Sequence, residues 1–598
     1  MKKRIAILFA LLTMAVSAPA YAATYYYVSP TGSDSNAGTS ENAPLATIGA
    51  AADKIKTKRT GEFIIRVMSG EYNLTESISF TSANSGSATK KITIQGYGET
   101  NPVFKSSAVI PATEFDSPTD EDILALLPSE SINKVKCVDL DDYGVGAMTR
   151  PLISSEATVG EAYADGVAMN IAQYPNPGEG YLKVGTVTGS ETKTPYFKYT
   201  DSRIDSFIDI GNIYAYGGWA HYWNSASFPV TNIDTTNKTL TLTNDRALEV
   251  ISGQEYYLYN VVEDLDVPGE YYIDKSTNII YFYPTENMQV LEVSKTIKDV
   301  FSLTQAAYIT FEKLDFDVSG GQGFNILGSD NITVKNCNFK NLGNRAITVN
   351  ASGTLQSSNV TIQNCTITEC GTGGITVSAG DRTTLTQGNV VIDGCDIYKC
   401  YRRGPFDGST CISISGCGVT LKNSKLHDMG ATVIHIAGNE HTILNNEIYN
   451  ACWATYDQGA LYMYGDWSYC GNVIEGNYFH HINGRKSTGV RAVYFDNMVS
   501  GNTVAKNIFA YCDDPVFIHG GKKFTIEDNI FFDCENSASV YPVSGYTDGD
   551  VSAKYPKGNV FRNNVSYNSG ECYMHPTYAL PYGGVLENNT TGEVVIYK

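Results

Sequence analysis

The sequence is poor in positive charge and in long apolar segments. Its 43 Lys and Arg residues face 63 Asp and Glu residues, which gives a formal net charge of −20 at pH 7. An acidic protein repels polyanions, so we expect no nucleic-acid partner, and a strongly acidic polysaccharide is disfavoured as a substrate. Beyond residue 22 no apolar run approaches the roughly 18 residues that a membrane helix needs, so no membrane span is predicted.

The one apolar stretch lies at the N-terminus. MKKR precedes IAILFALLTMAV, and Ala20-Tyr21-Ala22 has the small-residue pattern of a cleavage site. We interpret residues 1–22 as a secretory signal peptide cleaved near Ala22. The protein is therefore expected to be exported to the periplasm or the extracellular space.

CxxC spacing is also absent. The thirteen cysteines could pair in an exported protein, although an odd number leaves at least one thiol free. Without ligand-like spacing we predict no metal site and no cofactor for them, although Ca²⁺ is not excluded elsewhere. The spacing Cys365/Cys370 recurs at Cys395/Cys400 and has no explanation in the sequence.

A short phrase recurs from residue 334 onward. Examples are VKNCNF (334–339), ILNNEI (443–448) and IEDNIF (526–531). Ten copies follow one another at intervals of 22 to 35 residues, and no helical period appears between them. Such self-similarity in β-prone segments predicts an all-β solenoid, specifically a right-handed parallel β-helix.

The fourth position of this phrase forms a column. It holds Cys337, Cys365, Cys395, Ser424, Asn446, Asn477, Asn507, Asn529, Asn564 and Asn589. Stacked Asn side chains can hydrogen-bond along such a column, and Cys fills the same small slot as a weakly polar residue. We expect structural, mostly unpaired thiols here.

The repeat defines a domain organisation. Residues 23–111 are predicted to form an N-terminal cap and the first coils, because a solenoid must cover its terminal core. The cap should contain a strand, a loop and an Ala-rich helix. The repeat signal disappears over 112–295, which we interpret as an inserted all-β domain, and the main β-helix occupies 296–598. We expect a monomer.

A second phrase lies between the first ones and alternates apolar with other residues. Because side chains alternate faces along a strand, its second and fourth positions should form the core. These positions are Ile347/Val349, Ile375/Val377, Ile412/Ile414, Ile434/Ile436, Leu461/Met463, Val493/Phe495 and Val516/Ile518.

The outward positions change character along the chain. Early coils carry Thr, Ser and Asn there, whereas four successive later coils carry aromatic rings, His and a carboxylate. Neighbouring strands lie about 4.8 Å apart, so these side chains should form one surface. The predicted substrate-binding residues are His435, Tyr462, Tyr464, Trp467, Arg491, Tyr494, Phe517 and His519.

Carboxylates accompany this surface. Rings can stack on sugars, and glycoside hydrolysis typically uses two carboxyl groups. The candidate catalytic residues are Asp457 and Asp496, with Asp466 as a competing partner. Asp457 alone could equally be a turn or capping residue. His480 and His481 are expected in a loop.

In these segments the chain resembles right-handed parallel β-helix proteins related to glycoside hydrolase family 141. The resemblance covers most of the chain and rests on YYVSPTGSDSNAGTSENAPLATI, MNIAQYPN (169–176), GDRTTLTQGN (380–389), DQGALYMYGDW, RAVYFDN and FIHGG. It implies hydrolysis of plant or microbial glycans, with fucosidase and xylanase activities in the family and a pair of aspartates that falls on Asp457 and Asp496. Gln173 departs from the Arg that relatives often carry, which puts the insertion's share of the substrate pocket in doubt.

Three functions remain open from the residues alone. The first is a glycoside hydrolase acting on a polysaccharide or oligosaccharide. The second is a polysaccharide lyase, in which Arg491 would serve as the base and Asp513 and Asp514 would bind Ca²⁺. The third is a non-catalytic glycan-binding protein.

Overall fold

The computed structural model describes residues 23–56, 61–147, 160–188, 194–223, 225–244, 248–295, 299–402, 404, 410–485, 489–543, 556–577 and 579–593. The predicted signal peptide, 1–22, lies outside the described residues. Within the described part, no helix is long and apolar enough to cross a membrane.

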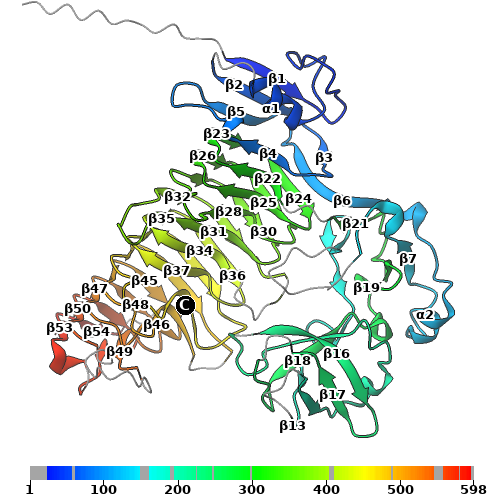
Figure 1. Cartoon of the computed structure of the whole chain (residues 1–598). Coiled ribbons are helices and arrows are strands. Elements are labelled where there is room, and N and C mark those ends of the chain that lie inside the picture. Colours follow the sequence, from blue (N-terminus) through cyan, green and yellow to red (C-terminus); the bar gives the residue numbers. More distant parts are fainter. Residues whose placement is uncertain are drawn as a thin grey trace, which may run out of the picture.

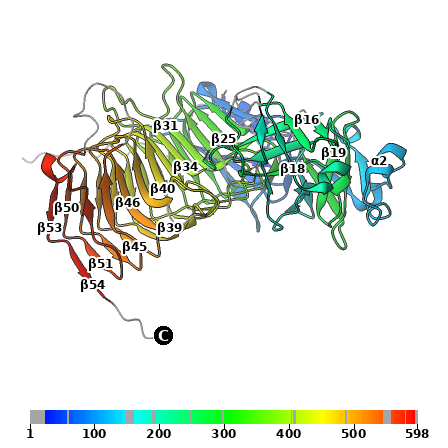
Figure 2. The ribbon, with the colours of Figure 1, turned by 90° about the horizontal axis from the view of Figure 1, so that it is seen from below.

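Three long sheets, here called A, B and C, wind around one elongated core (Figure 1, Figure 2). Apart from the antiparallel extension at one end of sheet B, their strands pair in parallel with the equivalent strands of the next coil. This arrangement follows from the repeats, because each coil buries its apolar positions only by stacking on its neighbours.

Sheet A contains, in spatial order, β1 (Thr24–Val28), β2 (Phe63–Met68), β5 (Ile92–Tyr97), β23 (Ala307–Glu312), β26 (Asp330–Lys335), β29 (Thr361–Gln363), β32 (Val390–Asp393), β35 (Val419–Lys422), β38 (Thr442–Leu444), β41 (Val473–Glu475), β44 (Thr503–Ala505), β47 (Thr525–Glu527), β50 (Val560–Arg562) and β53 (Val585–Glu587).

Sheet B contains β54 (Thr590–Gly592), β51 (Val565–Tyr567), β48 (Ile530–Phe532), β45 (Ile508–Ala510), β42 (Tyr478–Ile482), β39 (Glu447–Ala451), β36 (Lys425–Met429), β33 (Asp396–Tyr398), β30 (Thr366–Thr368), β27 (Asn338–Lys340), β24 (Asp315–Ser319), β6 (Val103–Pro111), β21 (Val290–Ser294), β8 (Ala162–Ala164) and β9 (Val167–Ala168), with β3 (Glu71–Asn73) beside β6.

Sheet C contains β4 (Ile78–Thr81), β22 (Asp299–Thr304), β25 (Gln322–Leu327), β28 (Ile347–Asn350), β31 (Gly373–Ala379), β34 (Thr410–Cys417), β37 (Ile434–Asn439), β40 (Gln458–Tyr464), β43 (Val490–Asp496), β46 (Asp514–His519), β49 (Ala538–Tyr541) and β52 (Tyr573–Met574).

Further elements lie outside the stacked coils. A four-stranded sheet holds β10 (Asn170–Ile171), β19 (Glu270–Asp274), β20 (Ile279–Phe282) and β7 (Lys136–Asp139). A larger sheet holds β11 (Gln173–Tyr174), β18 (Glu255–Tyr259), β15 (Tyr214–Gly217), β16 (Ala226–Asp234), β17 (Thr239–Leu242), β14 (Tyr196–Lys198), β13 (Val187–Thr188) and β12 (Leu182–Lys183). The helices are α1 (Ile48–Lys56), α2 (Glu121–Leu126) and the 3-10 turns η1 (Ser82–Asn84), η2 (Ala112–Glu114), η3 (Asp141–Tyr143), η4 (Ser202–Ser206), η5 (Val262–Asp264) and η6 (Leu580–Tyr582).

The N-terminal end of the core is covered by α1. Its residues Ile48, Ala51, Ala52 and Ile55 are buried and join the main apolar cluster. The sequence prediction of a strand, a loop and an Ala-rich helix is confirmed here.

The predicted column of small polar residues forms the corner between sheets A and B. A residue with positive φ, such as Asn445 or Lys506, turns the chain, and the next residue points into the coil. Asn477 Nδ2 donates to Asn507 Oδ1 at 3.0 Å, and the Asn477 amide donates to the same oxygen at 2.8 Å. The same pair of bonds recurs from Asn446 to Asn589, so the ladder is confirmed.

A second corner explains the unassigned cysteine spacing. After a three-residue strand of sheet B, the chain turns again at positive-φ residues such as Glu369 and Lys399. Cys370 and Cys400 follow these turns and are fully buried. Five residues therefore separate two corners of one coil, and all thirteen cysteines are free.

The predicted core positions are buried in every coil, from Ile347 and Val349 to Val516 and Ile518. One local prediction is wrong: His480 and His481 lie in β42, not in a loop. The strand continues because His480 stacks on Tyr449 of the neighbouring coil, with ring centroids 4.7 Å apart.

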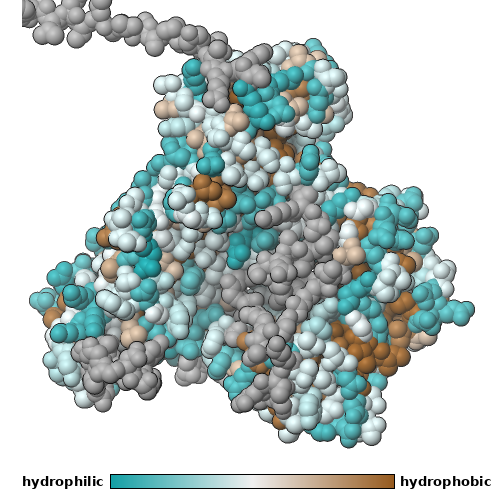
Figure 3. Space-filling model, in the orientation of Figure 1, coloured by the Kyte–Doolittle hydropathy of each residue, from teal (hydrophilic) through white to brown (hydrophobic). Residues whose placement is uncertain are grey.

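The segment between β6 and β21 packs beside the solenoid (Figure 1). It is rooted where β6 pairs with β24 in parallel and with β21 in antiparallel orientation. It then reaches later coils: Glu161 pairs with Arg402 at 2.9 Å, and Arg485 pairs with Glu255 at 2.5 Å. Figure 3 shows a largely hydrophilic face, with brown apolar areas gathered over this segment at the right.

Candidate active site

An aromatic ladder runs along the outer face of sheet C. Strand register places His435, Tyr462, Tyr494 and Phe517 at one level of successive strands. Their ring centroids are 6.2, 5.4 and 5.3 Å apart in that order. The structure thus brings together the rings that alternation predicted, because every coil repeats the same inward and outward positions. The neighbouring rings cover Tyr494, so it is only 3% exposed and does not lie on the solvent-exposed surface that the sequence indicated.

Asp496 ends β43, two residues beyond Tyr494 and level with Tyr464 of the neighbouring strand. It is 8% exposed, and it accepts hydrogen bonds from Tyr462 Oη at 2.9 Å and pairs with His519 Nδ1 at 2.9 Å. Burial acts to raise the pKa of Asp496, but the bonds from His519, Tyr462 and Tyr494 outweigh it and hold that pKa below its ordinary value. The carboxyl is therefore ionised at neutral pH.

Asp457 approaches the same position from the preceding corner. Its φ of 53° and the tight packing of Gly459 against Tyr494 bend the chain just before β40. Its carboxylate accepts a bond from Arg491 at 3.1 Å and from Tyr494 Oη at 3.4 Å. The ring of Tyr494 packs against the ring of Tyr462, which bonds Asp496, with centroids 5.4 Å apart, so the supports of the two carboxylates are in contact. Asp457 is about half exposed, at 52% of its side chain.

Arg491 is held rigidly beside this pair. Its guanidinium lies 4.6 Å from the ring centroids of both Tyr494 and Phe517 and donates to the Gly489 carbonyl at 2.9 Å. Asp514 Oδ2 lies 3.6 Å from Arg491 Nε. Burial raises the pKa of Asp514 to about 7 despite the opposing charge of Arg491. The sequence placed Asp514 near this surface but did not indicate that its pKa is raised. The cause is burial, and the position of a residue at the end of a strand does not show how deeply it is buried.

Asp466, the competing candidate, makes a separate set of bonds. Its Oδ1 accepts bonds from the Ser468 amide at 2.8 Å and the Ser468 hydroxyl at 2.7 Å, and Arg382 lies 3.4 Å from Oδ2. These bonds make it the cap of the turn after β40, and none of them reaches Asp496. The neighbouring Tyr464 and Trp467 are 52% and 72% exposed. They mark the open rim of the ladder.

Burial lowers the pKa of His435, so its ring is neutral at pH 7.

The segment between β6 and β21 also contacts the coil that carries Asp457. Tyr222 packs on Tyr456, the residue directly before Asp457, with ring centroids 5.5 Å apart. The segment 112–295 thus supplies a wall beside the candidate catalytic pair.

The ladder extends further than the sequence indicated. Tyr541 lies 5.8 Å from Phe517, and Tyr573 lies 5.0 Å from Tyr541, centroid to centroid. Both rings are more than a third exposed. Strand register places Tyr541 level with His519 and Tyr573 level with Phe517, so Tyr541 lies one outward position further along its strand. The sequence did not indicate these residues because the second phrase loses its pattern in the last coils.

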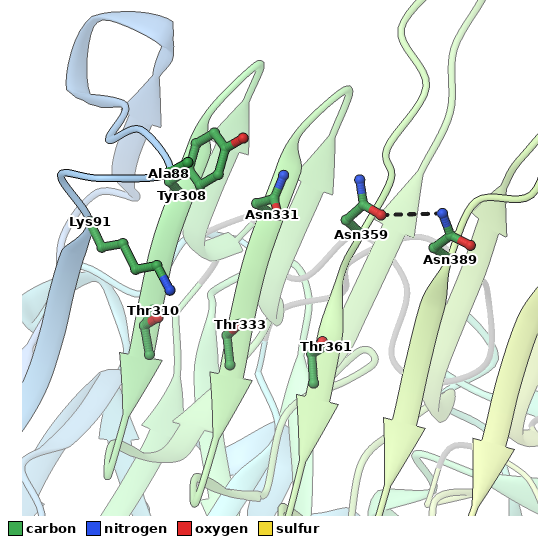
Figure 4. A pocket seen from close by; sticks show the side chains of 9 residues that line it. All are labelled: Ala88, Lys91, Tyr308, Thr310, Asn331, Thr333, Asn359, Thr361 and Asn389. Carbon is green, nitrogen blue, oxygen red and sulfur yellow. Dashed lines mark hydrogen bonds between the residues drawn. The ribbon is translucent and has the colours of Figure 1, made fainter. Parts of the chain in front are cut away.

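A separate hollow lies on sheet A (Figure 4). It is lined by Ala88, Lys91, Tyr308, Thr310, Asn331, Thr333, Asn359, Thr361 and Asn389. The figure shows Thr310, Thr333 and Thr361 in line on successive strands, and Asn389 Nδ2 donates to Asn359 Oδ1 at 3.3 Å. No carboxylate lines it, so it lacks the acid and base of a hydrolytic site.

No three Asp, Glu, His or Cys side chains converge on a metal position anywhere in the described residues. Asp513 and Asp514, suggested above as calcium ligands, are engaged otherwise: Asp513 accepts from the Gly484 amide at 2.9 Å and Asp514 faces Arg491.

Comparisons with known proteins agree with this architecture. A family model described as "Right handed beta helix region" matches residues 296–395 and 410–592. No curated protein matches the sequence significantly.

Several solved structures are similar in shape. One titled "Glycoside hydrolase" is 14% identical, with a TM-score of 0.53, covering 95% of this chain and 96% of its own. A complex of XylC with xylose is 12% identical, with a TM-score of 0.56, covering 95% and 86%. A lacto-N-biosidase from Eubacterium ramulus is 10% identical, with a TM-score of 0.39, covering 95% and 68%. The predicted fold class, an all-β right-handed parallel β-helix, is confirmed.

Proposed function

We propose that this protein is a glycoside hydrolase that cleaves a polysaccharide or oligosaccharide with Asp457 and Asp496. The carrying observation is that adjacent rings of one aromatic row hold the two carboxyl groups: Tyr494 bonds Asp457, Tyr462 bonds Asp496, and the two ring centroids are 5.4 Å apart. Hydrolysis of a glycosidic bond needs two carboxyls with different protonation behaviour close to one bond. Rings beside them suit the apolar faces of sugars.

The environments of the two carboxyls suggest different roles. Asp496 is buried and kept ionised by its three hydrogen-bond donors, which suits a base or a nucleophile. Asp457 is half exposed, so its carboxyl group is accessible to a bound substrate. Arg491 and Tyr494 orient Asp457, and His519 and Tyr462 orient Asp496.

The substrate class is proposed from the family resemblance and the net charge. The resemblance to family 141 proteins favours a xylan- or fucose-containing glycan, and the net charge of −20 favours a neutral one. We propose export of the protein on the strength of residues 1–22, and a reaction that needs no cofactor.

The lyase alternative requires a free base. Arg491 already binds Asp457 and Gly489 and is enclosed by two rings, so its guanidinium is ill suited to take a proton. A lyase would release an unsaturated uronate that absorbs in the ultraviolet, whereas a hydrolase releases only reducing ends.

The decisive experiment screens purified protein on xylans, pectins and aryl glycosides, including fucosides. Asp457→Asn and Asp496→Asn should each lower kcat by about 10²- to 10⁴-fold, the usual effect of removing an acid or base. Asp466→Asn is the control, because Asp466 bonds Ser468 and Arg382 and none of these bonds reaches the assigned pair, and it should stay near wild-type activity. Full activity in both variants would exclude the assigned pair, and glycan binding with no turnover of any substrate would favour a binding protein.

A further inference from the structure

The outer face of sheet C continues past the candidate catalytic pair to the C-terminal end of the solenoid. His519, which bonds Asp496 at 2.9 Å, lies level with Tyr541 on β49. Tyr573 follows on β52, the last strand of the sheet, at the level of Phe517. A continuous series of side chains therefore leads from one candidate catalytic carboxylate to the end of the sheet.

The two tyrosines at the end of this series are open to solvent. Tyr541 and Tyr573 are 38% and 37% exposed, whereas Tyr494 beside the catalytic pair is 3% exposed. Their rings stack with centroids 5.0 Å apart and an angle of 28° between their planes. Because β52 ends the sheet, no ring from a further strand of sheet C covers the far side of Tyr573.

The hydroxyls of these tyrosines are also available. Tyr462 donates to Asp496 and Tyr494 donates to Asp457, but within the described residues the hydroxyls of Tyr541 and Tyr573 make no hydrogen bond. Ring stacking alone needs no hydroxyl, as Phe517 shows on the same face. An exposed ring with a free polar tip suits a ligand that has both apolar surfaces and hydroxyl groups, which describes a sugar.

The spacing of the coils fits a chain of sugars. Tyr541 lies two coils beyond Asp496 and Tyr573 three, which is roughly 10 and 14 Å at about 4.8 Å per coil. A pyranose unit in an extended glycan advances by a length close to one coil. A glycan lying along the solenoid axis would therefore place successive units over successive coils.

We infer that Tyr541 and Tyr573 bind sugar units about two and three positions from the cleaved bond, so the substrate is a glycan chain of several units lying along the solenoid axis. This inference rests on the proposed function and extends its substrate site. In the other direction from the pair, beyond His435, the same level carries the small hydroxyl side chains of Ser413 and Thr376. Binding should accordingly be stronger on the C-terminal side of the cleaved bond.

The test compares the full-length wild type with Tyr541→Ala, Tyr573→Ala and the double variant. Affinity electrophoresis in native gels containing the xylans and pectins of the screen measures binding. Oligosaccharides of two to six units, cut from the polysaccharide that retards the wild type most, then serve for steady-state kinetics. The wild-type kcat/KM should rise with chain length, and each variant should lose about tenfold at the longer lengths, chiefly through KM, because tyrosine anchors often dominate a binding surface.

Two further sets of variants separate binding from packing. Tyr478→Ala is the matched control, since Tyr478 is also 37% exposed and stacks on His480 at 4.3 Å, but on sheet B, and it should keep the full dependence on chain length. Tyr541→Phe and Tyr573→Phe retain the stacked rings, so they should unfold at the wild-type temperature and still raise KM for long chains by a few-fold.

The outcomes distinguish this inference from the proposed function. Hydrolysis with unchanged dependence on chain length in the double variant, or wild-type KM in both Phe variants, would overturn the inference and leave the proposed function intact. Retardation that requires the two tyrosines, without hydrolysis of any glycan, would support the inference as a binding site and overturn the proposed hydrolase. Neither retardation nor hydrolysis by the wild type would overturn both.

Discussion

The Tyr494 hydroxyl supports the candidate pair at the scale of one residue. It donates to Asp457 Oδ1 at 3.4 Å, and together with His519 and Tyr462 it lowers the pKa of Asp496. A hydrogen bond to a carboxylate stabilises its anionic form, so the loss of this hydroxyl changes the electrostatics of the site.

Tyr494→Phe should therefore lower kcat while leaving substrate binding nearly intact. Removing one hydrogen bond to a charged group corresponds to about a 10- to 100-fold loss of rate. Steady-state kinetics on the substrate found in the screen provide the measurement. Tyr464→Phe, at an exposed ring of the same surface, is the control, and an equal loss in both variants would contradict a special role for the Tyr494 hydroxyl.

Asp496 should make stability depend on pH in a predictable direction. Its folded pKa is depressed, so its contribution is present above the ordinary Asp value of about 3.9 and is lost as pH falls through the lower folded value. Wild type should exceed Asp496→Asn in free energy of unfolding at pH 7, and the difference should shrink below about pH 4. Urea unfolding at several pH values tests this, and a gap that widens on acidification would refute the assigned hydrogen bonds.

At the scale of single elements, the corners determine the coil. Each corner places one positive-φ residue before one inward small residue, and the inward Asn side chains then bond both along and across the ladder. Asn507 shows the pattern in full: it accepts from the Asn477 amide and side chain, and its own Nδ2 donates to the Ile474 carbonyl at 2.9 Å.

Asn507→Ala should destabilise the protein by about 1–3 kcal/mol, because it leaves buried donors on the neighbouring coil unsatisfied. Asn563→Gly is the contrasting variant: Asn563 has a φ of 55° and an exposed side chain, and Gly tolerates that φ without cost. Thermal and urea unfolding should separate the two. Equal destabilisation would mean that the ladder bonds contribute little.

The cysteine columns predict a pattern of thiol reactivity. Cys470 is exposed, Cys137 and Cys572 are partly exposed, and the other ten thiols are buried. Burial raises the pKa of several of them, including Cys411 and Cys452, so thiolate is scarce there. A thiol reagent should label Cys470 first in the native protein and all thirteen in denaturant. Mass spectrometry of the labelled peptides checks this, and fewer than thirteen labels in denaturant would reveal a disulfide.

Sequence periodicity predicts the elements well where the same position recurs. The core pairs, the Asn ladder and the level shared by Tyr462, Tyr494 and Phe517 all follow from the repeat. The approach of Asp457 to Asp496 does not, because Asp457 lies five residues before the level of Tyr494. Its carboxylate reaches that ring only through the bend at Asp457 and Gly459, which no repeat specifies.

At the scale of the whole molecule, the inserted segment and the solenoid build the site jointly. Tyr222 and Glu255 contact Tyr456 and Arg485, which belong to the coils that carry Asp457 and Arg491. The residue pattern indicated an all-β interruption, and only the family resemblance suggested that it borders the substrate pocket. Contacts between distant segments are not periodic, so pattern analysis cannot locate them.

Arg485→Ala should loosen this contact and raise KM more than it lowers kcat, because Arg485 touches the wall and not the carboxyl pair. The guanidinium also lies 4.8 Å from the ring centroid of Tyr222, so its loss removes packing as well as charge. Arg562→Ala, at an exposed pair with Glu527 on sheet A, is the matched control and should leave both constants unchanged. A lower kcat with unchanged KM would argue against the view that the inserted segment lines one side of the substrate site.

The inserted segment leaves the solenoid at one coil and contacts the candidate site at another. The number of coils between them therefore fixes the distance that the segment must span. The segment leaves the solenoid beside β24, contacts Arg402 after β33, and reaches Tyr456 after β39, five coils beyond β24. At about 4.8 Å per coil this is roughly 24 Å, a length counted in whole coils. A deletion or duplication of one repeat between these two coils would preserve the side-chain ladders. It would also shift Asp457 and Asp496 by one coil relative to the inserted segment that packs beside them. Changes in loops and single residues can therefore alter the candidate site gradually. A change in the number of repeats within this span would instead misalign the inserted segment and the aspartates by a whole coil.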